Sequence, residues 1–221
     1  MCGRFAAFSP NEVYAEHFHA ISRVALNPRY NVAPSQPILA VREQENGERE
    51  LIPLRWGLIP SWAKDSQIGY RTINARAETV AEKPAFRHAF KKQRCLIPAD
   101  GFYEWKPEKA GKQPYFIHRK DHQPLGFAGL WEHWEGEEGV IESCTIIVTT
   151  ANEALRDIHD RMPVILSPTH YDTWLNPNNQ DPKQLQALLK PLSANRLEAY
   201  PVSTAVNSPR NDSADLLHRQ A

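Results

Sequence analysis

The second residue of the chain is a cysteine, in the opening segment MCGRF. If Met1 is removed, Cys2 carries a free α-amine and a thiol on neighbouring carbon atoms. Such an aminothiol captures aldehydes, because the amine condenses to an imine and the thiol then closes a thiazolidine ring. An α-amine has a pKa of about 7.8 and a lysine about 10.4, so the α-amine is far more often neutral and nucleophilic at pH 7. The alternative is that Cys2 is a small buried hydrophobe in a first strand.

Two further residues have the character of acid–base groups. Glu104 lies in the aromatic run at residues 101–105, where strand alternation puts it on the same face as Phe102. Desolvation beside an aromatic ring raises a carboxyl pKa toward the range useful for proton transfer. His159 lies in a polar cluster between apolar runs and titrates near neutrality. The plainer alternatives are a carboxylate paired at a sheet rim and a histidine interacting with a helix dipole.

Other residues suit binding. Asn74 follows an expected strand end and could orient a hydroxyl or carbonyl group, whereas Arg76 could hold a phosphate by paired hydrogen bonds. Turn chemistry and a surface ion pair are the alternatives for these two residues. A basic stretch and aromatic residues near it suit single-stranded nucleic acid. A solvated helix surface is the usual explanation for such charges, and most of the aromatic residues are expected in the core. The basic residues are Lys83, Arg87, Lys91, Lys92 and Arg94, and the aromatic ones are Trp56, Trp62, Tyr70, Tyr103 and Trp105.

The composition is that of an ordinary globular protein. The chain has 221 residues, of which 41% are hydrophobic, and its 26 Lys and Arg balance 26 Asp and Glu. Net charge therefore neither favours nor excludes a nucleic-acid partner. The three cysteines are far apart, which suits neither a disulfide framework nor a zinc site. We expect a cytoplasmic protein without a metal or other cofactor, and no apolar run approaches the roughly 18 residues of a membrane span.

The elements that must position these residues are mostly short strands. We expect strands at residues 95–98, 101–105, 114–118, 125–131 and 143–149, and a hairpin of residues 36–42 and 50–56 with Asn46-Gly47 at its tip. A capping box formed by Ser9, Pro10 and Glu12 predicts a helix that runs to about residue 19. Further helices are expected at 75–81, 84–92, 152–158, 171–175 and 183–189, and a loop at 29–34. The sum is a single α+β domain over residues 1–221, β-rich, with a mostly antiparallel sheet or barrel-like core flanked by short helices.

Several long motifs together resemble one family, the SOS response-associated peptidase (SRAP) family of abasic-site processing proteins. The matching segments are MCGRF (1–5), RYNVAPSQ (29–36), WGLIPSWAK (56–64), INARAET (73–79), RCLIPADGFYEW (94–105), QPYFI (113–117), AGLWE (128–132), TIIVTTAN (145–152), IHDRMPVIL (158–166) and, more weakly, YPVSTAVN (200–207).

The resemblance implies a function. Cys2, after loss of Met1, would trap the aldehyde of an abasic site in single-stranded DNA as a thiazolidine crosslink. Glu104 and His159 are implied as the acid–base pair and Asn74 as an orienting group, with no metal. Arg4, Trp62, Arg76 and Thr149, or Thr150 in place of Thr149, match positions that hold phosphates or stack bases. The expected protein is a monomer that associates with the nucleoid when bound to DNA. Side activities as an abasic-site lyase and as a peptidase that removes Met1 are also implied.

Two other functions compete with this interpretation. Cys2, His159 and Asn74 could be the nucleophile, base and orienting group of a cysteine peptidase. The chain could also be a non-covalent module for single-stranded DNA with an inert Cys2. A Cys2→Ser variant separates them, because it keeps the amine and loses the sulfur.

Overall fold

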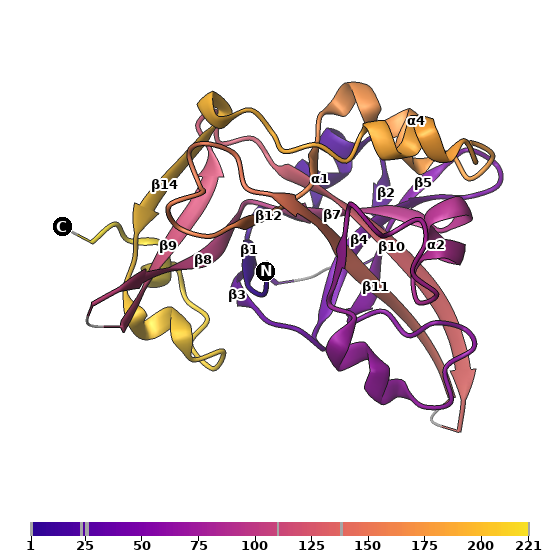
Figure 1. Cartoon of the computed structure of the whole chain (residues 1–221), viewed down its shortest axis with the longest axis horizontal. Coiled ribbons are helices and arrows are strands. Elements are labelled where there is room, and N and C mark those ends of the chain that lie inside the picture. Colours follow the sequence, from indigo (N-terminus) through magenta and orange to yellow (C-terminus); the bar gives the residue numbers. More distant parts are fainter. Residues whose placement is uncertain (1, 23, 25–26, 110, 138, 221) are drawn as a thin grey trace.

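Two β-sheets carry most of the fold, and the first strand of the chain belongs to the smaller sheet, where it contacts the larger one (Figure 1). The computed structural model describes residues 2–22, 24, 27–109, 111–137 and 139–220. The strands are β1 (Phe5–Ala7), β2 (Ile21–Ser22), β3 (Arg29–Val32), β4 (Pro37–Glu43), β5 (Arg49–Trp56), β6 (Asn74–Arg76), β7 (Arg94–Ala99), β8 (Gly101–Glu108), β9 (Gly111–Arg119), β10 (Leu125–Gly136), β11 (Gly139–Thr150), β12 (Arg161–Pro163), β13 (Ile165–Leu166) and β14 (Leu197–Pro201).

Short helices cover the sheets. The α-helices are α1 (Asn11–Phe18), α2 (Arg87–Lys92), α3 (Tyr171–Leu175) and α4 (Pro182–Ala187). The 3-10 helices are η1 (Ser66–Arg71), η2 (Pro168–His170), η3 (Ala194–Arg196), η4 (Thr204–Asn207) and η5 (Ala214–Leu217). Over the described residues, no helix is both long and apolar enough to cross a membrane.

The larger sheet closes on itself. Strands β11, β10, β7, β4 and β5 pair in that order, and β5 then pairs back onto β11 in parallel, with Cys144 opposite Trp56. The smaller sheet has the order β14-β9-β8-β1-β3, and its pairings are antiparallel. This arrangement confirms the expected β-rich α+β fold with a barrel-like, mostly antiparallel core.

Side-chain alternation along the barrel strands separates two apolar clusters. In β7, Cys95 and Ile97 pack into the cluster that holds Cys2 and Phe5, whereas Leu96 packs into a second cluster under the helices. The first cluster is therefore shared between the barrel and the small sheet, and it fixes the position of β1.

Most expected strands are present, and most extend beyond the predicted ends. The hairpin is confirmed as β4 and β5, and Gly47 at its tip has φ +82°. The helix at 171–175 is confirmed as α3, whereas the helices expected at 84–92 and 183–189 are shorter and correspond to α2 and α4.

Three local predictions are wrong because tertiary pairing overrides local preference. The expected loop at 29–34 is largely strand β3, which pairs with β1. The expected helix at 75–81 begins as strand β6, which pairs in parallel with β11. The expected helix at 152–158 is absent: residues 153–158 form successive turns, and the Asn152 side chain before them accepts a hydrogen bond from the Ala154 amide (3.1 Å). The chain then returns at once to pair β12 with β11.

The start of α1 also differs from the predicted capping box. Its N-cap is Pro10, without a side-chain cap, and the Ser9 hydroxyl donates instead to Asp100 (2.5 Å). Asp100 also accepts hydrogen bonds from the amides of Phe8 (2.5 Å) and Ser9 (2.8 Å) and from the Tyr14 hydroxyl (2.6 Å). One carboxylate between β7 and β8 thus anchors the end of β1 and the start of α1.

This anchor predicts a stability effect. Asp100→Ala leaves four donors without their acceptor, and we expect the free energy of unfolding to fall by about 3 kcal/mol. Urea denaturation followed by tryptophan fluorescence measures the change. Asp157→Ala, on an exposed carboxylate, serves as the control and should shift the value by less than about 0.5 kcal/mol. Equal values for both variants would show that Asp100 is not an anchor.

Candidate active site

The chain before β1 runs beside β8 and brings Cys2 to Glu104. Phe5 pairs with Phe102, and the amide of Tyr103 donates to the Arg4 carbonyl (3.0 Å). Cys2 is completely buried in the apolar cluster. Burial raises the pKa of its thiol, the nearby charge of Glu104 raises it further, and a hydrogen bond from the Arg4 amide lowers it. The thiol is therefore held as the protonated form close to a carboxyl group.

Glu104 is the buried acid of the site. Its residue surface is only 4% exposed, and burial raises the pKa of its carboxyl to about 8. As predicted, alternation in β8 places Phe102 in the cluster of Cys2 and Tyr103 in a separate cluster beyond the strand. At neutral pH, Glu104 is therefore mainly a carboxylic acid that can donate a proton.

His159 faces Glu104. Its Nε2 lies 3.8 Å from Glu104 Oε2, which is too long for a direct hydrogen bond. Burial lowers the pKa of His159, so both pKa shifts favour a neutral pair over an ion pair. The turns before β12 and the strand itself hold the imidazole at this place.

The tautomer of His159 follows from its other nitrogen. Nδ1 accepts a hydrogen bond from the Arg161 amide (2.9 Å) and also lies 2.9 Å from Asp160 Oδ1. The two contacts require different protonation states of Nδ1. The Arg161 amide can donate only if Nδ1 has a free lone pair, whereas the Asp160 carboxylate can accept only if Nδ1 carries a proton. The amide has hydrogen-bond geometry, whereas the Asp160 side chain is 85% exposed and so largely hydrated. We therefore assign the proton to Nε2, on the side of Glu104.

Asn74 and Thr149 lie on the paired strands β6 and β11. Strand β11 pairs with β6 on one side and with β12 on the other, with Asn74 opposite Ile146 and Thr149 opposite Met162. The Asn74 amide nitrogen donates to the carbonyls of Ile73 (3.0 Å) and Ile146 (3.4 Å). Its Oδ1 is buried and accepts no hydrogen bond from the described residues. Asn74 therefore keeps one buried acceptor that no described residue engages.

Trp56, one of the aromatic residues near the basic stretch, is a core residue at the end of β5 that links these strands. It is fully buried, packs on Phe5 with ring centroids 5.3 Å apart, and donates from Nε1 to the Ile73 carbonyl (2.9 Å). Its side chain thus fixes β6, and with it Asn74, relative to the strand that leads to Cys2. Trp56 does not stack on a ligand.

The four residues implied in DNA contacts differ in accessibility. Trp62 is 60% exposed, on a loop fixed by the Trp134 indole, which donates to the Ala63 carbonyl (2.8 Å). Arg76 is exposed, whereas Thr149 is buried and Thr150, its alternative, is exposed. Arg4 is half-buried, and its Nη1 donates to Asn31 Oδ1 (2.8 Å) and to the Val206 carbonyl (2.8 Å). Trp62 and Arg76 are thus the most available of the four.

The basic stretch is divided by the fold. Lys83, Arg87, Lys91 and Lys92 are exposed on or before α2, but Arg94 is buried and is not part of this surface. The Arg94 guanidinium donates instead to backbone carbonyls of α2, α3 and the loop after α3. The prediction that Arg94 belongs to a basic surface was wrong, because its guanidinium is buried and donates to backbone carbonyls at the ends of helices.

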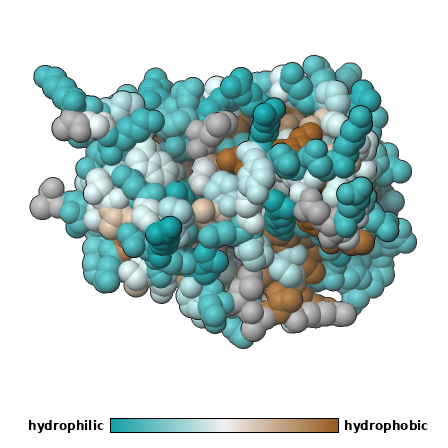
Figure 2. Space-filling model, turned by 90° about the horizontal axis from the view of Figure 1, so that it is seen from below, coloured by the Kyte–Doolittle hydropathy of each residue, from teal (hydrophilic) through white to brown (hydrophobic). Residues whose placement is uncertain are grey.

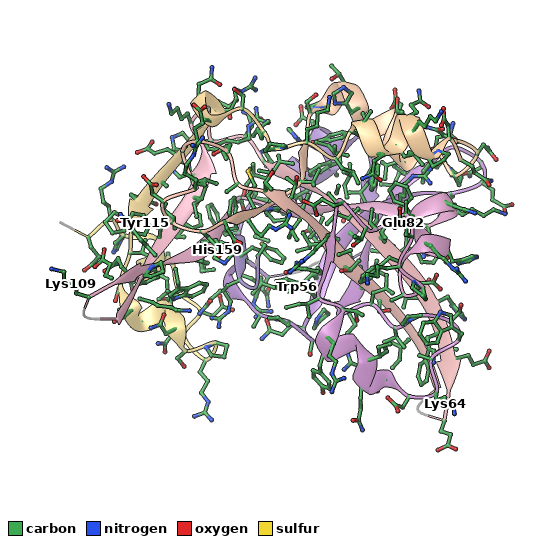
Figure 3. The ribbon with its side chains drawn as sticks, in the orientation of Figure 1. Trp56, Lys64, Glu82, Lys109, Tyr115 and His159 are labelled. Atoms are coloured by element: carbon green, nitrogen blue, oxygen red, sulfur yellow. The ribbon has the colours of Figure 1, made fainter. Side chains whose placement is uncertain are left out.

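An open pocket of about 520 Å³ lies against the acid–base pair. Glu104, Trp105, Lys112, His159 and Asn207 line it. Figure 3 shows His159 between the barrel and the small sheet. Lys112 and Asn207 were not among the predicted site residues. Asn207 ends the weak motif YPVSTAVN, and Lys112 immediately precedes the motif QPYFI without belonging to it.

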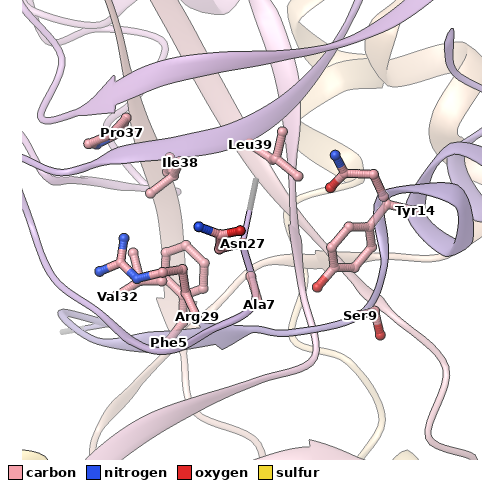
Figure 4. Close-up of a pocket in the computed structure, with 11 residues that line it drawn as sticks. Phe5, Ala7, Ser9, Tyr14, Asn27, Arg29, Val32, Pro37, Ile38 and Leu39 are labelled. Carbon is pink, nitrogen blue, oxygen red and sulfur yellow. The ribbon is translucent and has the colours of Figure 1, made fainter. Parts of the chain in front are cut away.

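A second cavity beside β1 is partly open and very small. Side chains of β1, β3, β4 and α1 line it, among them Phe5, Tyr14 and Arg29 (Figure 4). Its volume of about 30 Å³ is that of roughly one water molecule. It has no room for a substrate.

Together, the fold and the site define a class: a barrel-like β protein whose second residue, a cysteine, lies close to a buried carboxyl that faces a histidine. The family model described as "SOS response associated peptidase (SRAP)" matches residues 1–209. The chain belongs to the SRAP family.

Several relatives span the same length. The chain is 51% identical to abasic site processing protein YoaM of Bacillus subtilis, over 98% of this chain and 97% of the relative. It is 34% identical to abasic site processing protein YedK of Escherichia coli, over 98% and 99% of the two chains. A crystal structure of a Bacteroides thetaiotaomicron protein has a TM-score of 0.89 at 29% identity and covers 100% of both chains.

Proposed function

We propose that this protein, after removal of Met1, traps abasic sites in single-stranded DNA as a thiazolidine between Cys2 and the deoxyribose aldehyde. The observation that carries the proposal is the position of Cys2 beside Glu104, with His159 3.8 Å from that carboxyl. The relatives named as abasic site processing proteins support the same substrate. The reaction consumes one aldehyde and one aminothiol and releases one water, so it needs no oxidant or reductant.

The protons of the reaction can circulate through Glu104. The Cys2 amine adds to the aldehyde carbon and forms a carbinolamine. Glu104, held as the acid by burial, donates a proton to the carbinolamine hydroxyl, which leaves as water. As the thiol sulfur attacks the imine carbon, the Glu104 carboxylate accepts the thiol proton and becomes the acid again. The raised pKa of the thiol makes this base necessary, because little thiolate exists beforehand.

The other implied residues have roles before and around this step. His159 would open the deoxyribose hemiacetal, and the free acceptor of Asn74 would orient a sugar hydroxyl. Arg4, two residues from Cys2, would contact a phosphate near the trapped sugar. Arg76, Trp62 and Thr149 would hold the strand on either side, so binding should weaken with salt. We propose that residues 1–221 act as one domain and as a monomer.

Side reactions follow from the same imine. β-Elimination before ring closure would make the protein an abasic-site lyase. We also propose that any peptidase activity is confined to removal of Met1. A general cysteine peptidase is disfavoured, because such enzymes lower the pKa of the nucleophilic thiol and this site raises it.

A denaturing gel tests the proposal directly. Protein whose mass shows loss of Met1 is mixed with a single-stranded oligonucleotide that carries one abasic site. We expect a heat-stable shifted band that the intact oligonucleotide does not give. Equal non-covalent binding of both oligonucleotides, with no shifted band, would favour the DNA-binding module instead.

His159 should matter most for the opening of the sugar. His159→Ala is expected to slow crosslinking of a natural abasic site about 100-fold, as for loss of a general acid or base. An oligonucleotide with a linear aldehyde needs no ring opening and should be affected far less. Quenched-flow rates on the two substrates measure the difference, with the exposed His170→Ala as control. An equal loss on both substrates would place His159 in a later step.

A further inference from the structure

The pocket beside the acid–base pair has a wall that the chemistry above does not use. This wall consists of Trp105 from β8, Lys112 from β9 and Asn207 at the end of η4. It lies on the side of β8 and β9, which is the left half of Figures 1 and 2. Figure 2, which views the molecule from below, shows a mostly hydrophilic surface over that half. A polar part of the substrate, rather than an apolar one, is therefore the group this wall suits.

Asn207 lines the pocket, and its amide oxygen is already engaged by a neighbouring side chain. The Trp105 indole, which can only donate, gives its Nε1 hydrogen to Asn207 Oδ1 (2.7 Å). The bond identifies the amide oxygen, so Nδ2 with its two hydrogens is the end left for a ligand. Asn207 is exposed, and the chain before it is fixed because the Val206 carbonyl accepts from Arg4 Nη1 (2.8 Å) and Asn31 Nδ2 (3.2 Å).

Lys112 adds the charge. It is exposed on β9 opposite Pro107, and it forms no ion pair with any carboxylate of the described residues. Its ammonium is close enough to His159 to lower the pKa of that imidazole. The neighbouring Glu104 is mainly protonated and so does not neutralise it. A cation and an amide donor thus line one pocket, next to two groups that carry no charge at neutral pH.

We propose that Lys112 and Asn207 bind the phosphodiester next to the abasic nucleotide, with Trp105 holding the Asn207 amide in its donor orientation. An ammonium and a neutral amide N–H together match a phosphate that carries one negative charge. The inference rests on the proposed function, since it assigns a group of the same substrate. It makes the wall a positioning surface that holds the sugar against Glu104 and His159.

Binding to an oligonucleotide with a tetrahydrofuran abasic analogue tests the wall apart from the chemistry, because the analogue has no aldehyde. We expect Lys112→Ala to raise Kd about 3- to 5-fold, as for an exposed ion pair. The slope of log Kd against log salt should fall by about 0.7, as for one phosphate of a single strand. Lys109→Ala is the matched control, since Lys109 lies at the far tip of the same hairpin, away from His159 (Figure 3).

A neutral methylphosphonate at one phosphate locates the contact. Placed on the 5′ or the 3′ side of the analogue, it should weaken the wild type and leave Lys112→Ala unchanged at one of these two positions. Asn207→Ala should lose affinity at the same position, and Asn207→Asp should lose more. Effects of Lys112→Ala that equal those of Lys109→Ala, or no coupling at either phosphate, would overturn the inference. If the wild type also fails to crosslink a natural abasic site, the proposed function has failed instead.

Discussion

Cys2→Ala is expected to abolish the heat-stable crosslink to abasic DNA, with a loss of at least about 100-fold in yield. Alanine keeps a free α-amine once Met1 is removed, so an imine can still form. The thiazolidine cannot, because no sulfur is left to close the ring. The product should therefore hydrolyse on heating and should survive only after reduction with borohydride.

Cys2→Ser refines this prediction. Its hydroxyl is a poor nucleophile, so we expect a borohydride-trapped imine, little heat-stable product and more strand cleavage by β-elimination. Protein that retains Met1, prepared with methionine aminopeptidase inhibited, is the second control and should give neither product. A heat-stable band from Cys2→Ala would show that another residue, such as a lysine, forms the link. Full activity of the Met1-retaining protein would exclude the α-amine.

Glu104→Gln is expected to lower the rate of crosslinking by about 10²- to 10⁴-fold and to change its pH dependence. In the wild type, the rate should rise with pH as the α-amine loses its proton near about 7.8. It should then fall as Glu104, with a pKa of about 8, loses the proton that it must donate. The profile is thus a bell with its maximum near pH 8. The variant has no acid to lose, so its residual rate should stay level at high pH.

Stability provides the control for this variant. The pKa of Glu104 is raised on folding, so its favourable contribution is present at acidic pH and is lost as pH rises through about 8. Glutamine is never ionised, and we therefore expect Glu104→Gln to melt at a higher temperature than the wild type at pH 9. If Glu104→Gln crosslinks slowly but melts at a higher temperature than the wild type, its low rate is due to the lost acid and not to a damaged fold. A wild-type rate that does not fall above pH 8 would exclude Glu104 as the donor.

Local sequence determined the strands and the identity of the reactive groups. The apolar and aromatic runs of β7 to β11 are long enough to specify strands by themselves, and alternation in β8 correctly put Phe102 and Tyr103 on opposite faces. The order of the long motifs was sufficient to indicate the SRAP family, which the comparisons confirm. These features depend on residues that are near one another in the chain, so they can be read from it directly.

Only the tertiary structure decided which distant groups meet. The sequence around Ser9 predicts a helix cap, but in the fold its hydroxyl donates to the distant carboxylate of Asp100. The sequence around Arg94 predicts a surface charge, but in the fold its guanidinium donates to carbonyls at the ends of α2 and α3. The tautomer of His159 depends on the turn into β12, and the wall formed by Lys112 and Asn207 joins two segments with no shared pattern. Such contacts are set by how the whole chain buries its apolar surface and satisfies its polar groups. The secondary-structure preference of a segment depends on a few neighbouring residues, so it cannot specify contacts between residues that are far apart in the chain.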